Sequence, residues 1–414
     1  MYKKILLVSL KIIKDPVHGY VEVDEEILPL LDAPAIQRLR YIRQLGFSYL
    51  VYPGANHTRF EHSVGTMHLA GVACRQFGLT DDDRRLVMAA ALLHDIGHGP
   101  FSHASEPLME SRLGRTHDDI AGIAETQFGA LLESLAISPA EVCEVVKGRH
   151  RLSGIIHGDL DVDRMDYLLR DAYYTGAPYG TVDAHRLIRN LHLTSEGIVL
   201  DENGVNAAES LLVARTLMRP TVYYHHVSRI GECMFQLAVL DHMATGPAGG
   251  FERICALDDG ECMHELRKSD SPLAREMAGR LYERRLYKRA VYVGQDQVNA
   301  AAFQTGWTVE RAREVAVEIA GRAGCRASDV LVDIPPVPGE MSLEVQIKNR
   351  HALIGFAELF PRLQTLNQTR REQWRLGVYT LPEHRDVVAD AAAEILHIKK
   401  PTRQDTLFRS PALR

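Results

Sequence analysis

The sequence has little cysteine for its length, and none of it is paired at short spacing. The 414 residues include six cysteines, at positions 74, 143, 233, 255, 262 and 325, without a Cys-x-x-Cys pair. This spacing excludes a disulfide scaffold and indicates core thiols in a reducing compartment. We therefore expect a cytoplasmic protein.

Long apolar runs and glycine-rich phosphate loops are also lacking. No uninterrupted apolar segment approaches the roughly 20 residues of a membrane span, and the short one at residues 5–10 is typical of a β-strand. Because Gly-x-Gly-x-x-Gly and P-loop motifs are absent, side chains must hold any bound phosphate. The net charge of −6 argues against broad nucleic-acid binding and leaves room for a local basic pocket.

What is present is a large share of apolar residues at helical spacing. With 46% hydrophobic and 25% charged residues, the chain can bury a substantial core. The periodicity predicts helices from residue 25 to about residue 245, including 60–74 and 86–95. We predict a mainly α fold with a short N-terminal β-hairpin and a small C-terminal α+β lobe.

The Gly- and Pro-rich stretch 246–250 is the best candidate for a boundary. It divides the chain into a core, 1–245, a helical extension, 246–328, and an α+β lobe, 329–414. Beyond the boundary the patterns predict helices at 274–290, 309–323 and 383–396, and strands at 330–334, 343–347 and 375–380.

The strongest chemical signal is the segment 94–103, His-Asp-Ile-Gly-His-Gly-Pro-Phe-Ser-His. His94 and Asp95 end the apolar run 86–93, so a buried helix would present two ligands at its C-terminal end. With His62 upstream and an Asp-rich stretch downstream, the set suits Mn, Fe, Co, Ni or Zn and predicts a hydrolytic metal centre. A buried His94–Asp95 pair that merely closes a helix is the alternative. The imidazoles nearby, of which His117 is one, argue against it.

The Asp-rich stretch 159–171 leaves two candidates for a further ligand. Helical geometry puts Asp163, Tyr167 and Asp171 on one face, which would offer a ligand, a ring and an acceptor for a sugar. A solvated acidic face is the simpler explanation. Chemistry alone does not separate Asp161 from Asp163.

Further side chains could act on phosphate. Arg59 lies one turn before His62 and could clamp phosphate oxygens, or could pair with Glu61. His117 beside Asp118 is a pair suited to acid–base work. A second basic group could contact polyphosphate or form an interface: Arg215, Arg219, Tyr223, His225 and His226.

These residues resemble the HD-domain deoxynucleoside triphosphate triphosphohydrolases. The resemblance covers roughly residues 11–230 and rests on motifs in the same order at 15–19, 37–46, 53–55, 59–63, 94–103 and 161–167. It implies that the metal ligands are His62, His94, Asp95 and Asp163, which selects Asp163 over Asp161.

The resemblance also implies the remaining site residues. Gln44 and Leu45 would border the sugar, and Tyr167 and Asp171 would read its 3′ side. The phosphates would meet Arg59, His103, Arg164, Arg215 and Tyr223. His117 would be the general acid or base, and the rest of the implied catalytic set is Asp118, His98, His103, Glu106 and Arg59. Where this chain has Asp118 the family usually has Glu, and where it has Glu106 the mammalian member has Asp.

Members of this family are often dimers of dimers activated by a guanine nucleotide at a subunit interface. Asp32, Gln37 and Arg40 match the positions that read the guanine, so the resemblance implies an allosteric site for dGTP or GTP and a homo-oligomer, dimer or tetramer. A solvated or interface face of Arg38, Arg40 and Arg43 explains these residues equally well.

The sequence therefore predicts a dNTP triphosphohydrolase that uses one divalent transition metal, with Mg carried by the substrate triphosphate. Water would attack the α-phosphorus and release a deoxynucleoside and inorganic triphosphate. Leu45 beside the 2′ carbon would disfavour a ribose hydroxyl. The alternatives are another HD phosphohydrolase, such as a nucleoside monophosphatase or cyclic-nucleotide phosphodiesterase, and a non-catalytic nucleotide-sensing scaffold. We expect neither a membrane nor a nucleic-acid partner.

Overall fold

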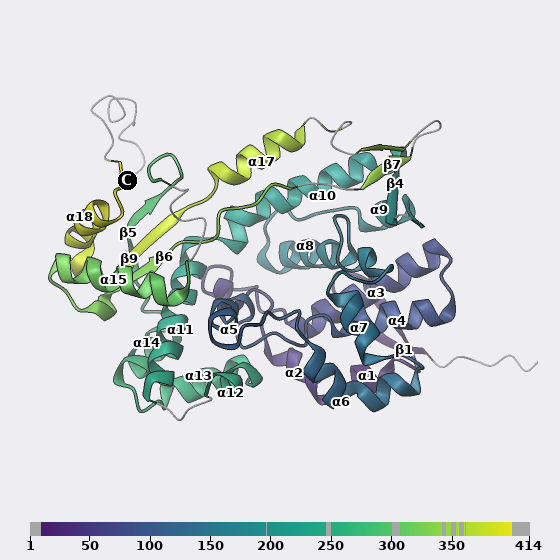
Figure 1. Ribbon diagram of the computed structural model, residues 1–414, viewed down its shortest axis with the longest axis horizontal. Helices are drawn as coiled ribbons and strands as arrows, with labels where there is room; N and C mark the ends of the chain where they lie inside the picture. The colour runs from purple at the N-terminus through teal and green to yellow at the C-terminus, as the bar shows by residue number, and fades with distance from the viewer. Residues whose placement is uncertain are drawn as a thin grey trace, which may run out of the picture.

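The computed structural model describes residues 10–195, 197–245, 250–299, 307–341, 345–348, 353–355, 360 and 362–399. Helices make up most of it, with small sheets at the N-terminus and in the C-terminal part (Figure 1). This confirms the predicted fold class. Within the described ranges, none of the helices combines the length and apolar character needed to cross a membrane. All six cysteines lie in the described part and are free thiols.

The chain begins with the predicted hairpin. Strands β1 (Leu10–Asp15) and β2 (Gly19–Asp24) pair antiparallel, with Asp15 opposite Gly19 at the turn. Asp15 Oδ1 accepts hydrogen bonds from the backbone N–H groups of Val17 and His18, at 2.9 and 2.8 Å. Gly19 has a φ of +80°, a backbone conformation that residues with a side chain rarely adopt. The strand predicted at 5–10 lies outside the described residues except for Leu10.

Three helices position the predicted ligands. Helix α3 (Arg59–Phe77) starts at a capping box of Thr58 and Glu61 and ends at a left-handed Gly78. Helix α4 (Asp81–Leu93) has three aspartates in its first turn and an entirely buried second half. Helix α8 (Val162–Thr175) starts at Asp161, whose side chain accepts from the Arg164 N–H. The helix predicted at 60–74 is confirmed, whereas the helix predicted at 86–95 ends at Leu93.

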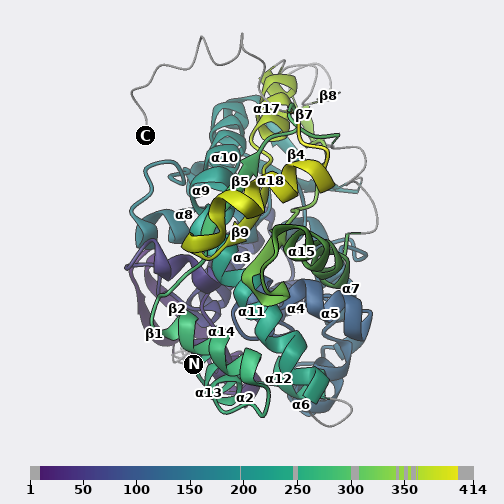
Figure 2. The same ribbon diagram turned by 90° about the vertical axis from the view of Figure 1, so that its left-hand side faces the viewer.

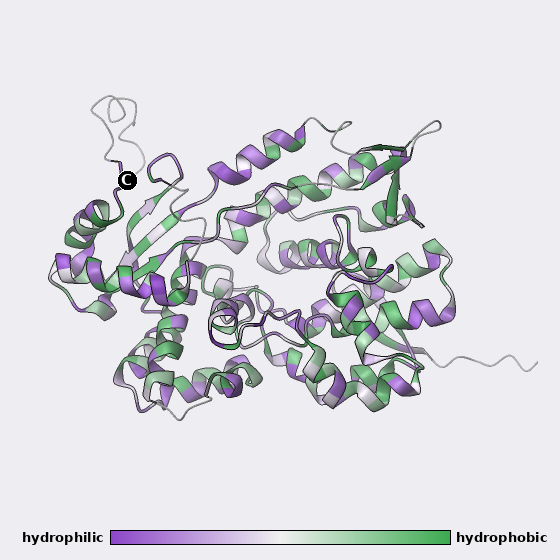
Figure 3. Ribbon diagram, in the orientation of Figure 1, coloured by the Kyte–Doolittle hydropathy of each residue, from purple (hydrophilic) through white to green (hydrophobic). Residues whose placement is uncertain are grey.

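The other helices of the core surround these three. Figure 3 shows that they carry both apolar and polar residues. The apolar residues of most of them join a hydrophobic core that extends from the hairpin to α10, whereas those of η2, η3, α5 and α11 pack in a second core. These surrounding helices are α1 (Leu28–Leu31), α2 (Pro34–Arg38), η1 (Leu39–Tyr41), η2 (Gly46–Leu50), η3 (Ser102–Ala104), α5 (Glu106–Leu113), α6 (Ala121–Ser134), α7 (Pro139–Val146), η4 (Ser153–Ile155), α9 (Ala184–Arg189), η5 (Glu202–Gly204), α10 (Val205–Met218), the π-helical turn η6 (Arg219–Tyr223) and α11 (His226–Thr245).

The C-terminal part contains two sheets. In one, β9 (Leu376–Thr380) pairs antiparallel with both β5 (Lys288–Val293) and β6 (Val330–Asp333), and α15 (Val309–Ala323) and α18 (Arg385–Ile395) pack beside it (Figure 2). In the other, β3 (Leu191–Thr194), β4 (Gly197–Asp201), β7 (Gln346–Lys348) and β8 (Leu353–Gly355) follow in that order, with β4 and β7 parallel. Helix α17 (Arg362–Glu372) runs beside α10 (Figure 1). The remaining elements are α12 (Gly250–Ala256), α13 (Asp259–Arg267), α14 (Pro272–Tyr282), η8 (Ala327–Asp329) and η9 (Pro382–His384).

Most predicted C-terminal elements are confirmed, namely α15, β6, β9 and α18. The helix predicted at 274–290 is wrong beyond Tyr282. The chain turns through Arg284, at a φ of +55°, and residues 288–293 pair with β9 instead. Strands β3 and β4 were not predicted. They form a hairpin with each other, and β4 also pairs with β7, which lies about 150 residues away in the chain. The candidate boundary 246–249 and residues 343–344 of a predicted strand lie outside the described residues.

Candidate metal centre

Four side chains from three elements converge. His62 lies on α3, His94 and Asp95 directly follow α4, and Asp163 is in the first turn of α8. Donor atoms of His62, His94 and Asp95 all lie within 4.8 Å of one another. The Asp163 Oδ1 atom lies 2.9 Å from His62 Nε2 and 3.7 Å from His94 Nε2. The structure thus brings together all four residues predicted as metal ligands.

The outer nitrogen of each histidine is held by an acceptor, so the inner nitrogen faces the other predicted ligands. His94 Nδ1 lies 2.7 Å from the carbonyl oxygen of Ala91, which can only accept, so Nδ1 carries the proton. His94 Nε2 is buried and has no hydrogen-bond partner among the described residues. His62 Nδ1 lies 2.7 Å from Asp166 Oδ2 in the same way. Metal-binding histidines have this arrangement, so the residues fit a divalent ion.

The negative charges of Asp95 and Asp163 favour the binding of a cation by the four predicted ligands. Burial raises the pKa of Asp95, but Arg59 and the neighbouring histidines hold it well below its usual range. Burial likewise raises the pKa of Asp163, but the neighbouring His62 and His94 outweigh burial, so this pKa is also lowered. Burial lowers the pKa of His62, but Asp163 and Asp166 raise it to about 10. Both carboxylates are therefore ionised at neutral pH.

The structure separates Asp161 from Asp163. Asp161 caps α8 by accepting from the N–H groups of Arg164, at 2.7 Å, and Gly158, at 2.9 Å, and it also pairs with the Arg164 guanidinium. Asp161 therefore caps the helix, whereas Asp163 lies next to both histidines.

A second cluster adjoins the first. Donor atoms of His98, His103, Glu106 and His117 lie within 4.8 Å of one another. The His98 ring stacks on His117 with centroids 4.0 Å apart, and its Nε2 lies 3.4 Å from Asp95 Oδ1. Glu106 accepts from His117 Nδ1 and lies 2.9 Å from His103 Nδ1. The cluster thus joins His117 to a ligand of the metal centre through one imidazole.

Two carboxylates hold His117, one on each ring nitrogen. Glu106 faces Nδ1, and Asp118 Oδ1 lies 2.9 Å from Nε2. Burial lowers the pKa of His117, but its bonds to Asp118 and Glu106 raise the pKa to about 10. His117 is therefore protonated at neutral pH. The resemblance places Asp118 and Glu106 in the catalytic set, but sequence reasoning did not identify the contact of Glu106 with His117.

Arg59 is buried beside the metal centre and does not pair with Glu61. It donates to Asp95 Oδ2 at 2.7 Å and to Ser102 Oγ at 2.9 Å. Its Nη2 has no hydrogen-bond partner within the part of the chain that the structure describes. Glu61 instead caps α3 and accepts from the Tyr174 hydroxyl at 2.6 Å.

The residues predicted to bind the sugar line one side of this centre. The Tyr167 ring lies 6.5 Å from the His62 ring and 6.1 Å from the Tyr223 ring, and Tyr223 donates to Asp171 Oδ2 at 2.8 Å. His57 Nε2 holds the other Asp171 oxygen at 2.8 Å. Burial raises the pKa of Tyr167 to about 12 against the nearby charge of Arg215.

Gln44 and Leu45 sit on the loop between η1 and η2. The Gln44 side chain is buried, and its Oε1 has no hydrogen-bond partner among the residues described. Leu45 is half-buried against the main core.

The three residues predicted to read an activator lie on neighbouring elements: Asp32 ends α1, Gln37 is on α2 and Arg40 is on η1. Arg40 Nε donates to Gln37 Oε1 at 2.7 Å, and Gln37 Nε2 donates to the Leu31 carbonyl at 2.8 Å. Asp32 pairs with Lys11 of the hairpin at 3.9 Å. Arg38, in contrast, is engaged with the backbone carbonyls of His98 and residues 255–257.

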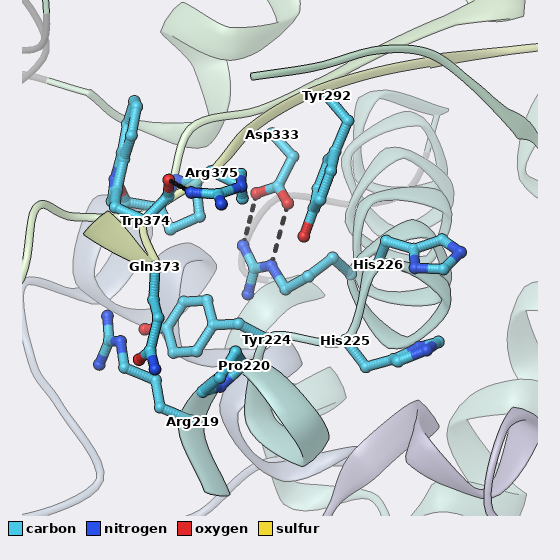
Figure 4. A pocket seen from close by; sticks show the side chains of 12 residues that line it. Arg219, Pro220, Tyr224, His225, His226, Tyr292, Asp333, Gln373, Trp374 and Arg375 are labelled. Carbon is cyan, nitrogen blue, oxygen red and sulfur yellow. Dashed lines mark hydrogen bonds and ion pairs between the residues drawn. The ribbon is translucent and has the colours of Figure 1, made fainter. Parts of the chain in front are cut away.

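The basic group 215–226 divides between two places. Arg215 and Tyr223 face the Tyr167 side, whereas Arg219, His225 and His226 line a separate cavity of about 270 Å³ between η6 and the C-terminal sheet (Figure 4). Across that cavity Arg229 donates to both oxygens of Asp333, at 3.1 and 2.6 Å. This ion pair joins α11 to β6.

Comparison with known proteins agrees with this geometry. Residues 59–171 match the HD domain, and residues 182–407 match the HD associated region. An uncharacterized protein of Methanocaldococcus jannaschii is 33% identical over 90% of this chain and 80% of its own length. A hypothetical protein from Aquifex aeolicus, known from its crystal structure, has a TM-score of 0.74 and 29% identity over 92% of this chain and 100% of that one.

Human deoxynucleoside triphosphate triphosphohydrolase SAMHD1 is 29% identical over 70% of this chain. The match spans 56% of the human enzyme, so it covers little more than half of that protein. Because the HD associated region alone spans more than half of the 414 residues, the family is clear. The chain belongs to the HD-domain phosphohydrolases and combines an HD domain with an HD associated region.

Proposed function

We propose that this protein is a metal-dependent dNTP triphosphohydrolase, which releases a deoxynucleoside and inorganic triphosphate. The observation that carries the proposal is the convergence of His62, His94, Asp95 and Asp163 beside Tyr167. Support comes from the similarity to the human dNTP triphosphohydrolase. When bound by these four residues, a divalent Mn, Fe, Co, Ni or Zn ion would polarise the phosphate and lower the pKa of water.

The surrounding cations would stabilise charge on the phosphate oxygens. Arg59 is fixed by Asp95 and Ser102 and keeps Nη2 for a phosphate oxygen. His117 is protonated at neutral pH and can donate a proton to an oxygen that gains charge. His98 and His103 lie beside it, and Arg164 and Arg215 add positive charge on the α8 and α10 sides, with Mg accompanying the triphosphate.

The sugar would lie against Tyr167 and the Tyr223–Asp171 pair. Asp171 Oδ2 already receives the Tyr223 hydroxyl and retains a lone pair for a sugar 3′ hydroxyl. We place Gln44 and Leu45 on the opposite side of the sugar. Leu45 offers no partner to a ribose 2′ hydroxyl, so we expect dNTPs to be preferred over NTPs.

Product analysis tests this function directly. The purified protein is incubated with each dNTP and Mn or Mg, and the products are separated by chromatography. We expect intact triphosphate and the deoxynucleoside, with slower turnover of GTP than of dGTP. His94→Ala and Asp95→Ala should reduce turnover to background while the circular dichroism spectrum is preserved. Release of orthophosphate or pyrophosphate without triphosphate would instead favour another HD phosphohydrolase.

We also propose that Asp32, Gln37 and Arg40 bind dGTP or GTP as an activator in a homo-oligomer. The Gln37–Arg40 hydrogen bond presents an amide and a guanidinium side by side, which suits the edge of a guanine. Turnover of a single non-guanine dNTP should rise on adding GTP, and Gln37→Ala should remove the rise without lowering the unstimulated rate. An identical rate with and without GTP would contradict this.

A further inference from the structure

A second set of buried charges connects the N-terminal hairpin with His62. Asp166 Oδ2 lies 2.7 Å from His62 Nδ1, and Asp166 Oδ1 lies 2.6 Å from His18 Nε2. Arg170, one turn further along α8, donates to both oxygens of Asp166 at 2.9 Å and to Asp15 Oδ2 at 2.8 Å. The side chains of Asp166 and Arg170 have no exposed surface. The hairpin turn is therefore joined to a predicted metal ligand by an unbroken chain of hydrogen bonds.

A buried network of charged side chains contributes little to the free energy of unfolding. Removing two carboxylates and a guanidinium from water carries a desolvation penalty, and apolar residues of the same size often give equal or greater stability. Its contact with His62 points to a role in the neighbouring site.

Helix α3 has a glycine, Gly65, at the position where it passes the network. A Cβ on Gly65, one turn after His62, would lie 1.9 Å from Asp166 Oδ1 and 2.3 Å from Arg170 Nη2. Gly65 thus lets the ion pair approach the backbone of the helix that carries His62.

The hairpin turn is built around the same charges. Asp15 uses Oδ1 to accept the N–H groups of Val17 and His18, and it uses Oδ2 to accept from Arg170. One carboxylate therefore sets both the turn that carries His18 and the position of Arg170. The ring of His18 is in consequence directed at Asp166.

We propose that Asp166, supported by His18, Asp15 and Arg170, is the positioning residue that fixes His62 for metal binding. The proposal rests on the proposed metal centre. Asp166 accepts the Nδ1 proton, which turns the Nε2 atom to the side of the ring where Asp95 and Asp163 lie and would make the ring a stronger ligand. His94 obtains the same orientation from the carbonyl of Ala91, within its own helix. His62 alone of the two histidines depends on residues distant in the chain.

Cobalt binding measures this role without an activity assay. Metal-free wild type, Asp166→Asn and His18→Ala are titrated with Co²⁺ and followed by visible absorption. Mutation of the hydrogen-bond partner behind a ligand typically weakens metal affinity about 10–100-fold, which we expect for Asp166→Asn because it removes the charge of the acceptor. His18→Ala should weaken affinity by a smaller factor in the same direction and alter the cobalt spectrum.

Asp24→Asn is the matched control. Asp24 also ties the hairpin to a core helix, through Arg84 of α4 at 2.5 Å, but it does not reach His62 by this chain of contacts. Its cobalt affinity should equal that of the wild type. Thermal unfolding of each metal-free variant is recorded in parallel, since a merely structural role would lower the melting temperature and leave the cobalt affinity and spectrum unchanged.

If Asp166→Asn does not fold, His18→Ala decides, because it leaves the Asp166–Arg170 pair in place. Wild-type affinity and spectrum in every folded variant at the two positions would overturn the proposal. A wild type that binds no cobalt would overturn both this proposal and the metal centre. If the wild type binds cobalt and hydrolyses dNTPs, and the variants bind cobalt equally well, only this proposal is overturned.

Discussion

At the scale of single residues, the site is defined by which atom of each side chain is already engaged. Ala91 occupies His94 Nδ1 and Asp166 occupies His62 Nδ1, so both Nε2 atoms turn to the same point. Arg59 is held at two of its nitrogens and keeps a third for a ligand. The chemistry we propose depends on which nitrogen atoms face the metal and the phosphate, and not on the number of polar residues in the site.

Glu106 controls the charge on His117, which gives a prediction on pH. Because the folded-state pKa of His117 is raised from 6.5 to about 10, protonated His117 stabilises the fold fully below pH 6.5, and this contribution is lost as the pH rises through about 10. Glu106→Gln removes one of the two carboxylates. The basic limb of kcat/KM against pH should therefore move toward neutral pH.

The control for this prediction is Glu110→Gln, an exposed carboxylate on the same helix α5. Its pH profile should match the wild type. An unchanged basic limb in Glu106→Gln would show that His117 does not carry the proton.

At the scale of elements, the loop after α4 depends on close backbone contact. A Cβ on Gly97 would lie 2.1 Å from the carbonyl oxygen of His117, so no side chain fits without moving one of the two segments. These segments carry His94, Asp95 and His117. The glycine in His-Asp-Ile-Gly-His thus joins the metal centre to the acid–base cluster.

Gly97→Ala should therefore lower kcat substantially. A displacement of catalytic groups by about 1 Å can cost on the order of 100-fold in rate, and we expect a loss of that size. Gly129→Ala on α6 is the matched control, because within the described residues nothing lies within 4 Å of its Cβ. It should keep full activity and gain up to about 1 kcal/mol of stability. Equal rates for both variants would disprove the close-contact argument.

At the scale of the whole molecule, the C-terminal part is bound to the core at several places, two of which show how. Strand β7 extends the β3–β4 hairpin, and the Arg229–Asp333 pair joins α11 to β6 beside the cavity of Figure 4. Residues 288–293, which the sequence predicted to be helical in part, belong to the sheet with β6 and β9. The HD associated region is therefore built into the core rather than appended to it.

Asp333→Asn tests that attachment. Asp333 is nearly buried, and breaking a buried ion pair from one side typically costs about 3 kcal/mol, so the free energy of unfolding should fall by roughly that amount. Glu394→Gln breaks the fully exposed pair with Arg322 and should leave unfolding unchanged. Chemical denaturation of both variants measures the difference. A wild-type value for Asp333→Asn would mean that the pair does not join the two parts.

The sequence predicts what depends on local periodicity, and it does so closely. Helix α15 has the predicted ends, and His94 and Asp95 lie at a helix end as their apolar run indicated. The sheet β3–β4–β7–β8 could not be predicted in this way, because it joins segments far apart in the chain.

For the same reason the roles of Asp166 and Arg170 were missed. They stand four apart on α8, a spacing that signals an ion pair, but only the fold places His62, His18 and Asp15 around them. The contact of Glu106 with His117 bridges 11 residues across a loop and likewise has no periodic signal.

The most direct test of the metal centre is a crystal structure of the metal-loaded protein with anomalous diffraction at the absorption edge of the bound metal. We expect one strong peak within bonding distance of His62, His94, Asp95 and Asp163. A peak held instead by His98, His103, Glu106 and His117, or none near either group, would contradict it.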